Sequence, residues 1–100
     1  MQLIEAIINP GKLSAVEAAL SQAGFDNITV TPVLGWGQHH QAPVYFQGSV
    51  YEWDMDQRLK LEFVIEDNQA EQVVGLIERS ARTGRHGDGS IFVIPLTDVI

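Results

Sequence analysis

The sequence predicts an α+β fold, with one antiparallel sheet and two helices on one of its faces. Two segments place apolar residues at helical spacing, and four short segments are apolar or rich in β-branched residues. They follow one another as β-α-β, a long loop, and β-α-β, which is the order of a split βαβ arrangement. Because the chain has 100 residues, we expect residues 1–100 to form a single domain.

The first half of the chain begins with an expected strand over residues 3–8, which is apolar and ends before the Asn-Pro-Gly of residues 9–11. Residues 13–23 repeat apolar side chains at helical spacing and predict a helix. The Ser-Ala-Val-Glu of residues 14–17 has the spacing of a capping box at the start of this helix. Gly24 is expected to mark its end.

The second strand is expected over residues 28–34, which are rich in Thr and Val. Pro32 indicates either that this strand lies at an edge of the sheet or that it is irregular. Residues 35–58 then show no helical period and hold both Trp, both Tyr and two of the three His. Long loops in compact domains are usually functional. Short strands are possible within it, for example at Val44, Phe46 or Val50.

The second half repeats the order of the first. Residues 59–66 alternate apolar and mostly polar side chains and predict a third strand. Residues 68–71 carry a second capping signal, and the apolar stripe of residues 70–81 predicts a helix that stops before Gly84. Residues 91–96 form the last expected strand. The six segments together have the ferredoxin-like βαββαβ order.

Composition excludes several classes of protein. Six Lys and Arg against thirteen Asp and Glu give a net charge of −7, so binding to nucleic acid is not expected. The chain has no cysteine for a disulfide, a thiolate zinc site or a Cys nucleophile. No apolar run approaches the roughly 18–20 residues that cross a bilayer, so no membrane insertion is expected. The N-terminus lacks a basic secretory region, and we expect a cytoplasmic protein.

The most informative segment is residues 83–90, with the sequence Thr-Gly-Arg-His-Gly-Asp-Gly-Ser. Its three glycines allow backbone amides to approach an anionic ligand, and Arg85 adds positive charge. Asp88 either orients a ribose or fixes the turn. The alternative is a tight connection from helix to strand whose glycines serve turn geometry alone.

A second glycine-rich element, residues 35–40, stands where a strand enters the long loop. Trp36 either stacks on a ligand or packs in the core. His39 and His40 are adjacent, so in extended chain they point to opposite sides and are poorly placed to bind one metal ion together. A metal would need His86 or carboxylates as well, and we predict no metal site.

Arg58 and Glu62 lie four residues apart and share one face of the third strand. They form either a surface ion pair or a cation for an anionic ligand, oriented by a carboxylate. The serines have no nucleophile-elbow context, and no carboxylate pair marks an evident pocket. We therefore predict no catalytic residues and no enzyme activity.

The chain resembles the PII signal-transduction proteins nearly from end to end. The most specific motif is Ala81-Arg82-Thr83-Gly84, followed by Gly87-Asp88-Gly89 and Ile91-Phe92-Val93. Further matches are Ala6-Ile7-Ile8-Asn9-Pro10, Lys12-Leu13, Thr29-Val30-Thr31, Val33, Gly35-Trp36-Gly37, Gly48, Tyr51 and the strand 59–65.

The resemblance implies a homotrimer with an adenine-nucleotide site in each cleft between neighbours. It implies signalling to a regulated protein partner through the long loop, called the T-loop, at about residues 37–56. The candidate nucleotide-binding residues are Ile7, Thr29 (from the neighbouring subunit), Gly35, Trp36, Gly37, Gln38, Arg58, Glu62, Val64, Thr83, Gly84, Arg85, Gly87, Asp88, Gly89 and Ser90. The resemblance implies a regulator and not an enzyme.

The sequence departs from the PII pattern where the family places its pocket cations. Gln38 stands in place of the usual arginine, and Ser90 in place of the usual lysine. His39 replaces the glutamine that helps to hold magnesium and 2-oxoglutarate, while Arg58 keeps a positive charge. Tyr51, the position that is uridylylated in some members, is retained in altered surroundings.

These departures predict a preference for ADP or AMP over ATP. Hydrogen bonds to charged groups contribute roughly 1.5–3 kcal/mol each, so missing cations weaken the binding of a third phosphate most. The divergence is similar to that of a carboxysome-associated PII-like branch, which implies bicarbonate as a second ligand. Its candidate site is Gly37, Gln38, His39, His40 and Arg58. The implied partner acts in inorganic-carbon or nitrogen transport or metabolism.

The alternative is a trimer of the same fold that binds a divalent metal or another small molecule. It is favoured by the three histidines, His39, His40 and His86, and by the acidic end of the T-loop.

Overall fold

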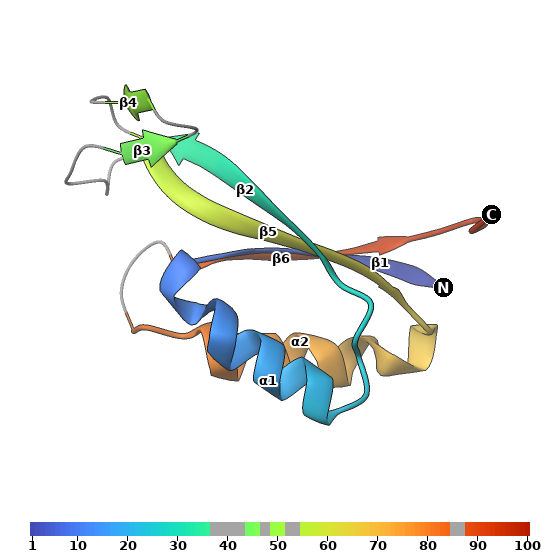
Figure 1. The fold of residues 1–100 in the computed structure, drawn as a ribbon. Coiled ribbons are helices and arrows are strands. Elements are labelled where there is room, and N and C mark those ends of the chain that lie inside the picture. Colours follow the sequence, from blue (N-terminus) through green and yellow to red (C-terminus); the bar gives the residue numbers. More distant parts are fainter. Residues whose placement is uncertain (37–43, 47–48, 52–54, 85–87) are drawn as a thin grey trace.

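The computed structural model describes residues 1–36, 44–46, 49–51, 55–84 and 88–100 (Figure 1). The strands are β1 (Gln2–Ile8), β2 (Thr29–Trp36), β3 (Val44–Phe46), β4 (Ser49–Tyr51), β5 (Met55–Ile65) and β6 (Gly89–Pro95). The helices are α1 (Leu13–Gln22) and α2 (Ala70–Ala81), each preceded by a 3-10 turn, η1 (Pro10–Lys12) and η2 (Asp67–Gln69). Both predicted βαβ units are therefore confirmed.

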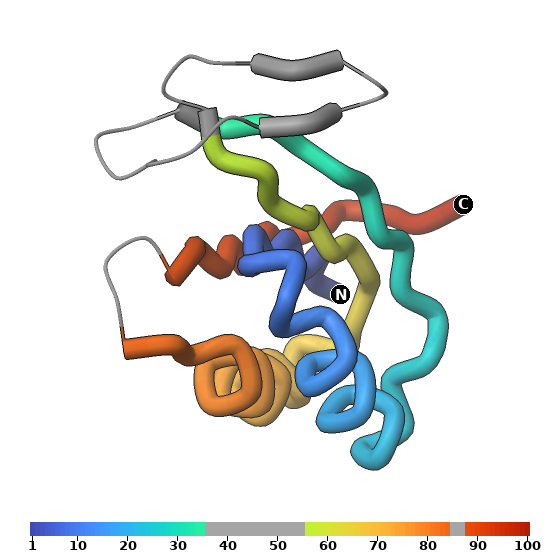
Figure 2. Tube along the Cα trace, turned by 60° about the vertical axis from the view of Figure 1, so that its left-hand side comes forward, coloured from blue at the N-terminus to red at the C-terminus, as the bar shows by residue number. Residues whose placement is uncertain are grey.

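Four strands form one antiparallel sheet in the order β2-β5-β1-β6, and β3 pairs with β4 in a separate hairpin. Both helices lie on one face of the sheet (Figure 1). Figure 2 shows α1 and α2 side by side beneath it. None of the helices that the structure describes covers the other face of the sheet, which is called the helix-free face below. The predicted ferredoxin-like arrangement is confirmed.

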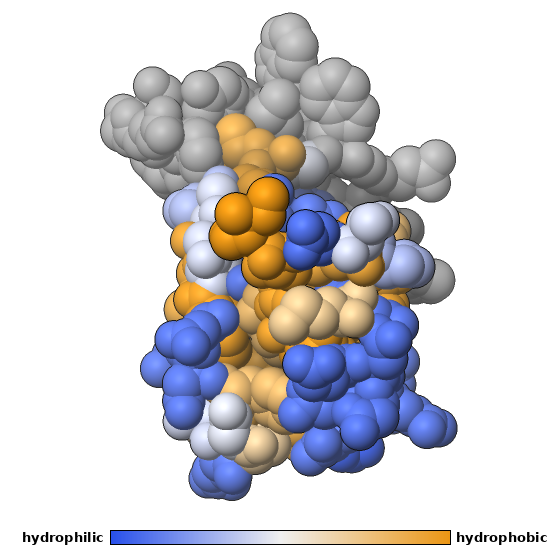
Figure 3. Space-filling view, turned by 90° about the vertical axis from the view of Figure 1, so that its right-hand side faces the viewer, coloured by the Kyte–Doolittle hydropathy of each residue, from blue (hydrophilic) through white to orange (hydrophobic). Residues whose placement is uncertain are grey.

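The core lies between the sheet and the helices. Alternate residues of the two central strands point into it, because side chains of a strand alternate between faces. Its members are at most 7% exposed: Ile4, Ala6, Ile8, Val16, Leu20, Leu61, Phe63, Ile65, Val73, Ile77 and Ala81. Seen from the end that carries both termini, apolar atoms run between hydrophilic flanks (Figure 3). The described residues include no helix long and apolar enough to span a bilayer.

Both predicted helix caps are wrong. Ser14 is not the first cap, because η1 starts the helical path at Pro10, whose fixed φ suits a first helical position. The second helix is preceded by η2, whose N-cap is Glu66 and not a residue of the segment 68–71. There the Glu66 amide donates to Gln69 Oε1 at 2.9 Å. The helices themselves start at Leu13 and Ala70, as expected, and a 3-10 turn precedes each start.

The strand bounds differ from those expected mainly at the T-loop. β5 already begins at Met55, within the expected long loop, and β6 begins at Gly89. The short strands foreseen at Val44, Phe46 and Val50 are present in β3 and β4. β2 lies at an edge of the sheet, which is one of the two alternatives that Pro32 indicated.

Candidate functional site

Seven strand residues of the candidate nucleotide set share the helix-free face, whereas Gly89 lies on the other side by the same register. In the sheet register Lys60 lies opposite Ile7, and Ile7 lies opposite Ser90. Core residues such as Ala6 and Leu61 alternate with these positions and face the helices. The same alternation and register place the following residues on the helix-free face: Ile7, Thr29, Gly35, Arg58, Glu62, Val64 and Ser90.

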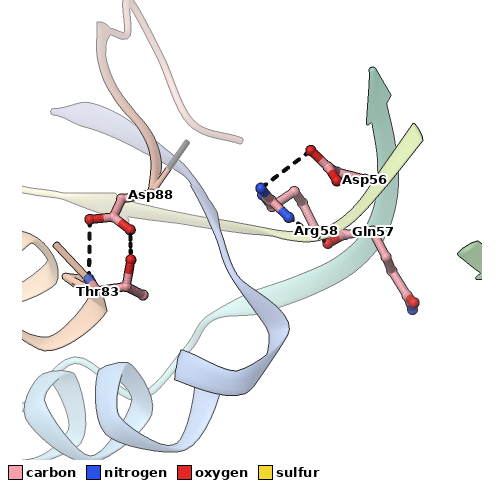
Figure 4. A network of polar contacts seen from close by, with 5 residues as sticks. All are labelled: Asp56, Gln57, Arg58, Thr83 and Asp88. Atoms are coloured by element: carbon pink, nitrogen blue, oxygen red, sulfur yellow. Dashed lines mark hydrogen bonds and ion pairs between the residues drawn. The ribbon is translucent and has the colours of Figure 1, made fainter. Parts of the chain in front are cut away.

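Arg58 is held by its own strand at the base of the T-loop. Its Nη2 lies 3.5 Å from Asp56 Oδ2, and its Nη1 donates to the Gln57 carbonyl oxygen at 3.1 Å. The side chains of Arg58 and Asp56 are only 20% and 27% exposed. Figure 4 shows them turned toward each other while the Gln57 side chain points away. A guanidinium with several donors in one plane suits a planar anion.

A second cation on this face lies between two carboxylates. Lys60 Nζ is 3.5 Å from Glu62 Oε1 and 4.0 Å from Glu5 Oε1. Glu5 and Glu62 lie directly opposite each other in the register of β1 and β5, so the lysine relieves their mutual repulsion. The expected partnership of Arg58 with Glu62 is therefore replaced by two others, Arg58 with Asp56 and Lys60 with Glu62.

Asp88 closes the loop that joins α2 to β6. Its Oδ2 accepts hydrogen bonds from the Thr83 amide at 3.1 Å and the Gly84 amide at 3.2 Å, and its Oδ1 accepts one from Thr83 Oγ1 (Figure 4). The Thr83 hydroxyl and then the Thr83 amide hold the pKa of Asp88 below its ordinary value. Gly84 has a φ of +81°, which favours glycine. Of the two roles considered for Asp88, this geometry shows the fixing of the turn.

Gly89 is required by close approach to β1. Its φ is +129°, and a Cβ at this position would lie 1.8 Å from the Ile7 carbonyl oxygen. The contact brings the loop residues against Ile7, another member of the candidate set. At the same edge of the sheet, α2 and β6 border a cleft of about 340 Å³. Its lining includes four candidate residues, Ile7, Asp88, Gly89 and Ser90.

Part of the candidate set lies outside the described residues. These are Gly37, Gln38, His39, His40, Arg85 and Gly87, and also His86. Trp36 is the last residue of β2. Within the part of the chain that the structure describes, no three His, Asp or Glu side chains form a group that could hold a metal ion.

Comparison with known proteins identifies the family. The family model described as nitrogen regulatory protein P-II matches residues 1–100. The chain belongs to the P-II family. Proteins named nitrogen regulatory protein P-II from Microchaete diplosiphon, Rhizobium meliloti and Azospirillum brasilense are 44%, 42% and 41% identical to it. Each match covers 100% of this chain and 89% of the relative.

Membership of the P-II family confirms the resemblance drawn from the Thr83–Ser90 segment and its neighbours. The relatives are named as regulatory proteins, in agreement with a regulator rather than an enzyme. Sequence reasoning missed two residues that this P-II chain places at the site, Asp56 as the partner of Arg58 and Lys60 as the partner of Glu62. Both stand two residues from their partners, a spacing that puts them on one face of a strand.

Proposed function

We propose that this P-II protein senses adenine nucleotides in clefts between the subunits of a homotrimer and signals to a partner protein through the T-loop. The observation that carries the proposal is the gathering of Ile7, Arg58, Glu62 and Ser90 on the helix-free face. The loop closed by Asp88 abuts that face through Gly89.

The helix-free face supports the homotrimer. It exposes apolar side chains, among them Val64, Phe92 and Ile94, and Phe92 is 50% exposed. Contiguous apolar surface of this kind is usually covered by a partner. A neighbouring subunit on this face would also bring its Thr29 toward the nucleotide, as the family resemblance implies.

The charges on the face support ADP or AMP over ATP. The two cations described there, Arg58 and Lys60, both already face carboxylates at 3.5 Å. Each additional phosphate of the ligand is therefore repelled by these carboxylates as well as attracted by the two cations. With Gln38 and Ser90 in place of cations, a third phosphate gains few charged partners, each of which contributes about 1.5–3 kcal/mol elsewhere.

The second ligand is proposed to be bicarbonate. It is a small planar anion that one guanidinium can bind through two parallel hydrogen bonds. Arg58 would supply these, together with residues 37–40 at the start of the T-loop. Binding at the base of the T-loop would couple the ligand to the segment that contacts a partner in inorganic-carbon or nitrogen transport.

The experiment compares Arg58→Gln with Arg79→Gln, which removes the same charge from the exposed surface of α2. We expect calorimetry to show ADP affinity about tenfold lower in Arg58→Gln and unchanged in Arg79→Gln. Bicarbonate should raise ADP affinity in the wild type and in Arg79→Gln only. Equal ADP affinity in all three proteins would contradict a site at Arg58. If bicarbonate leaves the ADP affinity of the wild type unchanged, the proposal that bicarbonate is the second ligand is wrong.

A further inference from the structure

The ion pair of Asp56 and Arg58 has a second consequence. Both residues lie on the helix-free face of β5, where Asp56 is opposite Gly35 and Arg58 is opposite Val33 of β2. Their charged groups are 3.5 Å apart and mostly shielded from solvent. The pair is anchored again by the bond from Arg58 to the Gln57 carbonyl oxygen. Any anion that reaches the Arg58 guanidinium thus arrives beside a resident carboxylate.

We propose that Asp56 is a specificity-determining residue that selects against highly charged anions at Arg58. The identity of the anion rests on the proposed function, but the selection follows from the ion pair itself. Repulsion between Asp56 and a ligand grows with the ligand's charge, whereas the attraction of Arg58 is already partly neutralised. Asp56 therefore disfavours ATP more than ADP, ADP more than AMP, and bicarbonate least.

The other carboxylates on this face are placed differently. Glu5 and Glu62 share Lys60 as a counterion, at 4.0 and 3.5 Å, so their charges are partly compensated within their own group. Asp56 instead neutralises the cation proposed to meet the ligand. It also lies opposite Gly35, a member of the candidate set, where β2 approaches the T-loop. Removing its charge should thus change anion selectivity more than removing a charge elsewhere.

The test uses three variants. Asp56→Asn removes the charge with little change of shape, and Asp56→Glu retains it. Asp26→Asn is the matched control: it makes the same change of net charge in the loop after α1, and its oxygen can still accept from Ser21 Oγ. Calorimetry would give the dissociation constants for AMP, ADP and ATP at low and high salt.

We expect Asp56→Asn to bind ATP about tenfold more tightly than the wild type, ADP a few-fold more tightly, and AMP almost unchanged. Added salt should reduce these differences, since it screens partly exposed charges. Asp26→Asn and Asp56→Glu should match the wild type. The proposal is overturned if Asp56→Asn shows wild-type selectivity, or if it loses affinity for all three nucleotides equally.

Inorganic pyrophosphate separates this inference from the proposed function. If no variant binds adenine nucleotides but Asp56→Asn gains pyrophosphate affinity over Asp26→Asn, the nucleotide proposal fails and the selection by Asp56 stands. If nucleotides bind and the selectivity does not move, only the role of Asp56 fails. If no variant binds any of these anions, both are wrong.

Discussion

Single residues determine how closely the connection between α2 and β6 packs against β1. Gly89 combines a left-handed φ with a contact that leaves no room for a Cβ, whereas Gly24, after α1, has a φ of +94° and nothing within 4 Å. A substitution at Gly24 would therefore introduce backbone strain alone, whereas a substitution at Gly89 would introduce both strain and steric overlap. Overlap with a β1 carbonyl can be relieved only by moving β6 away from β1.

Gly89→Ala is predicted to lower the free energy of unfolding by about 4 kcal/mol, because strain and overpacking add. Gly24→Ala should cost about 1–2 kcal/mol, from backbone strain alone. Urea denaturation of both variants measures the difference. Equal losses of unfolding free energy in the two variants would contradict the close contact between Gly89 and the Ile7 carbonyl oxygen.

Asp88 is predicted to titrate below an ordinary aspartate, because the Thr83 hydroxyl and amide donate to its charged form. Its contribution to stability is then present above the ordinary aspartate pKa of about 4 and is lost as the pH falls through its lower native pKa. In Thr83→Val the pKa of Asp88 should rise toward the ordinary value, and in Thr83→Ser it should stay low. Carbon-13 NMR of the Asp88 carboxyl group measures this pKa. If the pKa of Asp88 is the same in Thr83→Val as in the wild type, the hydrogen bond from the Thr83 hydroxyl to Asp88 is wrong.

At the scale of elements, the two helices and the alternation of β5 together define the core. The period of residues 59–66 was sufficient to predict which side chains of β5 are buried, since a strand can bury only alternate residues. The first helical residues, Leu13 and Ala70, agree with the sequence pattern, but the helix caps do not. The chain enters both helices through 3-10 turns, and before α2 the capping box is formed by Glu66 and Gln69 at the 3-10 turn.

The candidate site was predictable to a similar extent. The faces of Arg58 and Glu62 follow from the period of the strand, but their partners do not. Asp56 could be assigned to the same face only once β5 was known to begin at Met55. The bonds of Asp88 depend on the backbone turn at Gly84, a conformation that several turn sequences share.

The packing of α2 on the sheet predicts a large loss for Ile77→Ala. Ile77 is 1% exposed and belongs to the core, so its truncation should lower the free energy of unfolding by about 3 kcal/mol. Leu76→Ala is the neighbouring control and should cost less, because Leu76 is only partly buried. Urea denaturation again provides the measurement, and a loss below about 1 kcal/mol for Ile77→Ala would contradict this packing.

In the whole molecule, the helix-free face is the surface proposed both for nucleotide binding and for subunit contact. It carries the candidate nucleotide residues and exposes Phe92, Val64 and Ile94 at the same time. Covering it with neighbouring subunits would bury the apolar side chains and complete the proposed sites. Assembly and nucleotide binding are therefore expected to depend on the same surface.

Phe92→Asp is predicted to dissociate the homotrimer, because the new charge would have to be buried unpaired at the subunit contact. Val99→Asp adds the same charge at a similarly exposed residue beyond β6 and should leave the trimer intact. Light scattering after gel filtration distinguishes three chains of 11.0 kDa from one. A trimeric Phe92→Asp, or a monomeric wild type, would refute this role of the helix-free face.

Calorimetry of the unmodified protein would measure its preference for nucleotides with fewer phosphates. ADP, AMP and Mg-ATP would each be titrated with and without 2-oxoglutarate. We expect tighter binding of ADP and AMP than of Mg-ATP, and no gain in affinity from 2-oxoglutarate. Tight Mg-ATP binding that 2-oxoglutarate strengthens would contradict it.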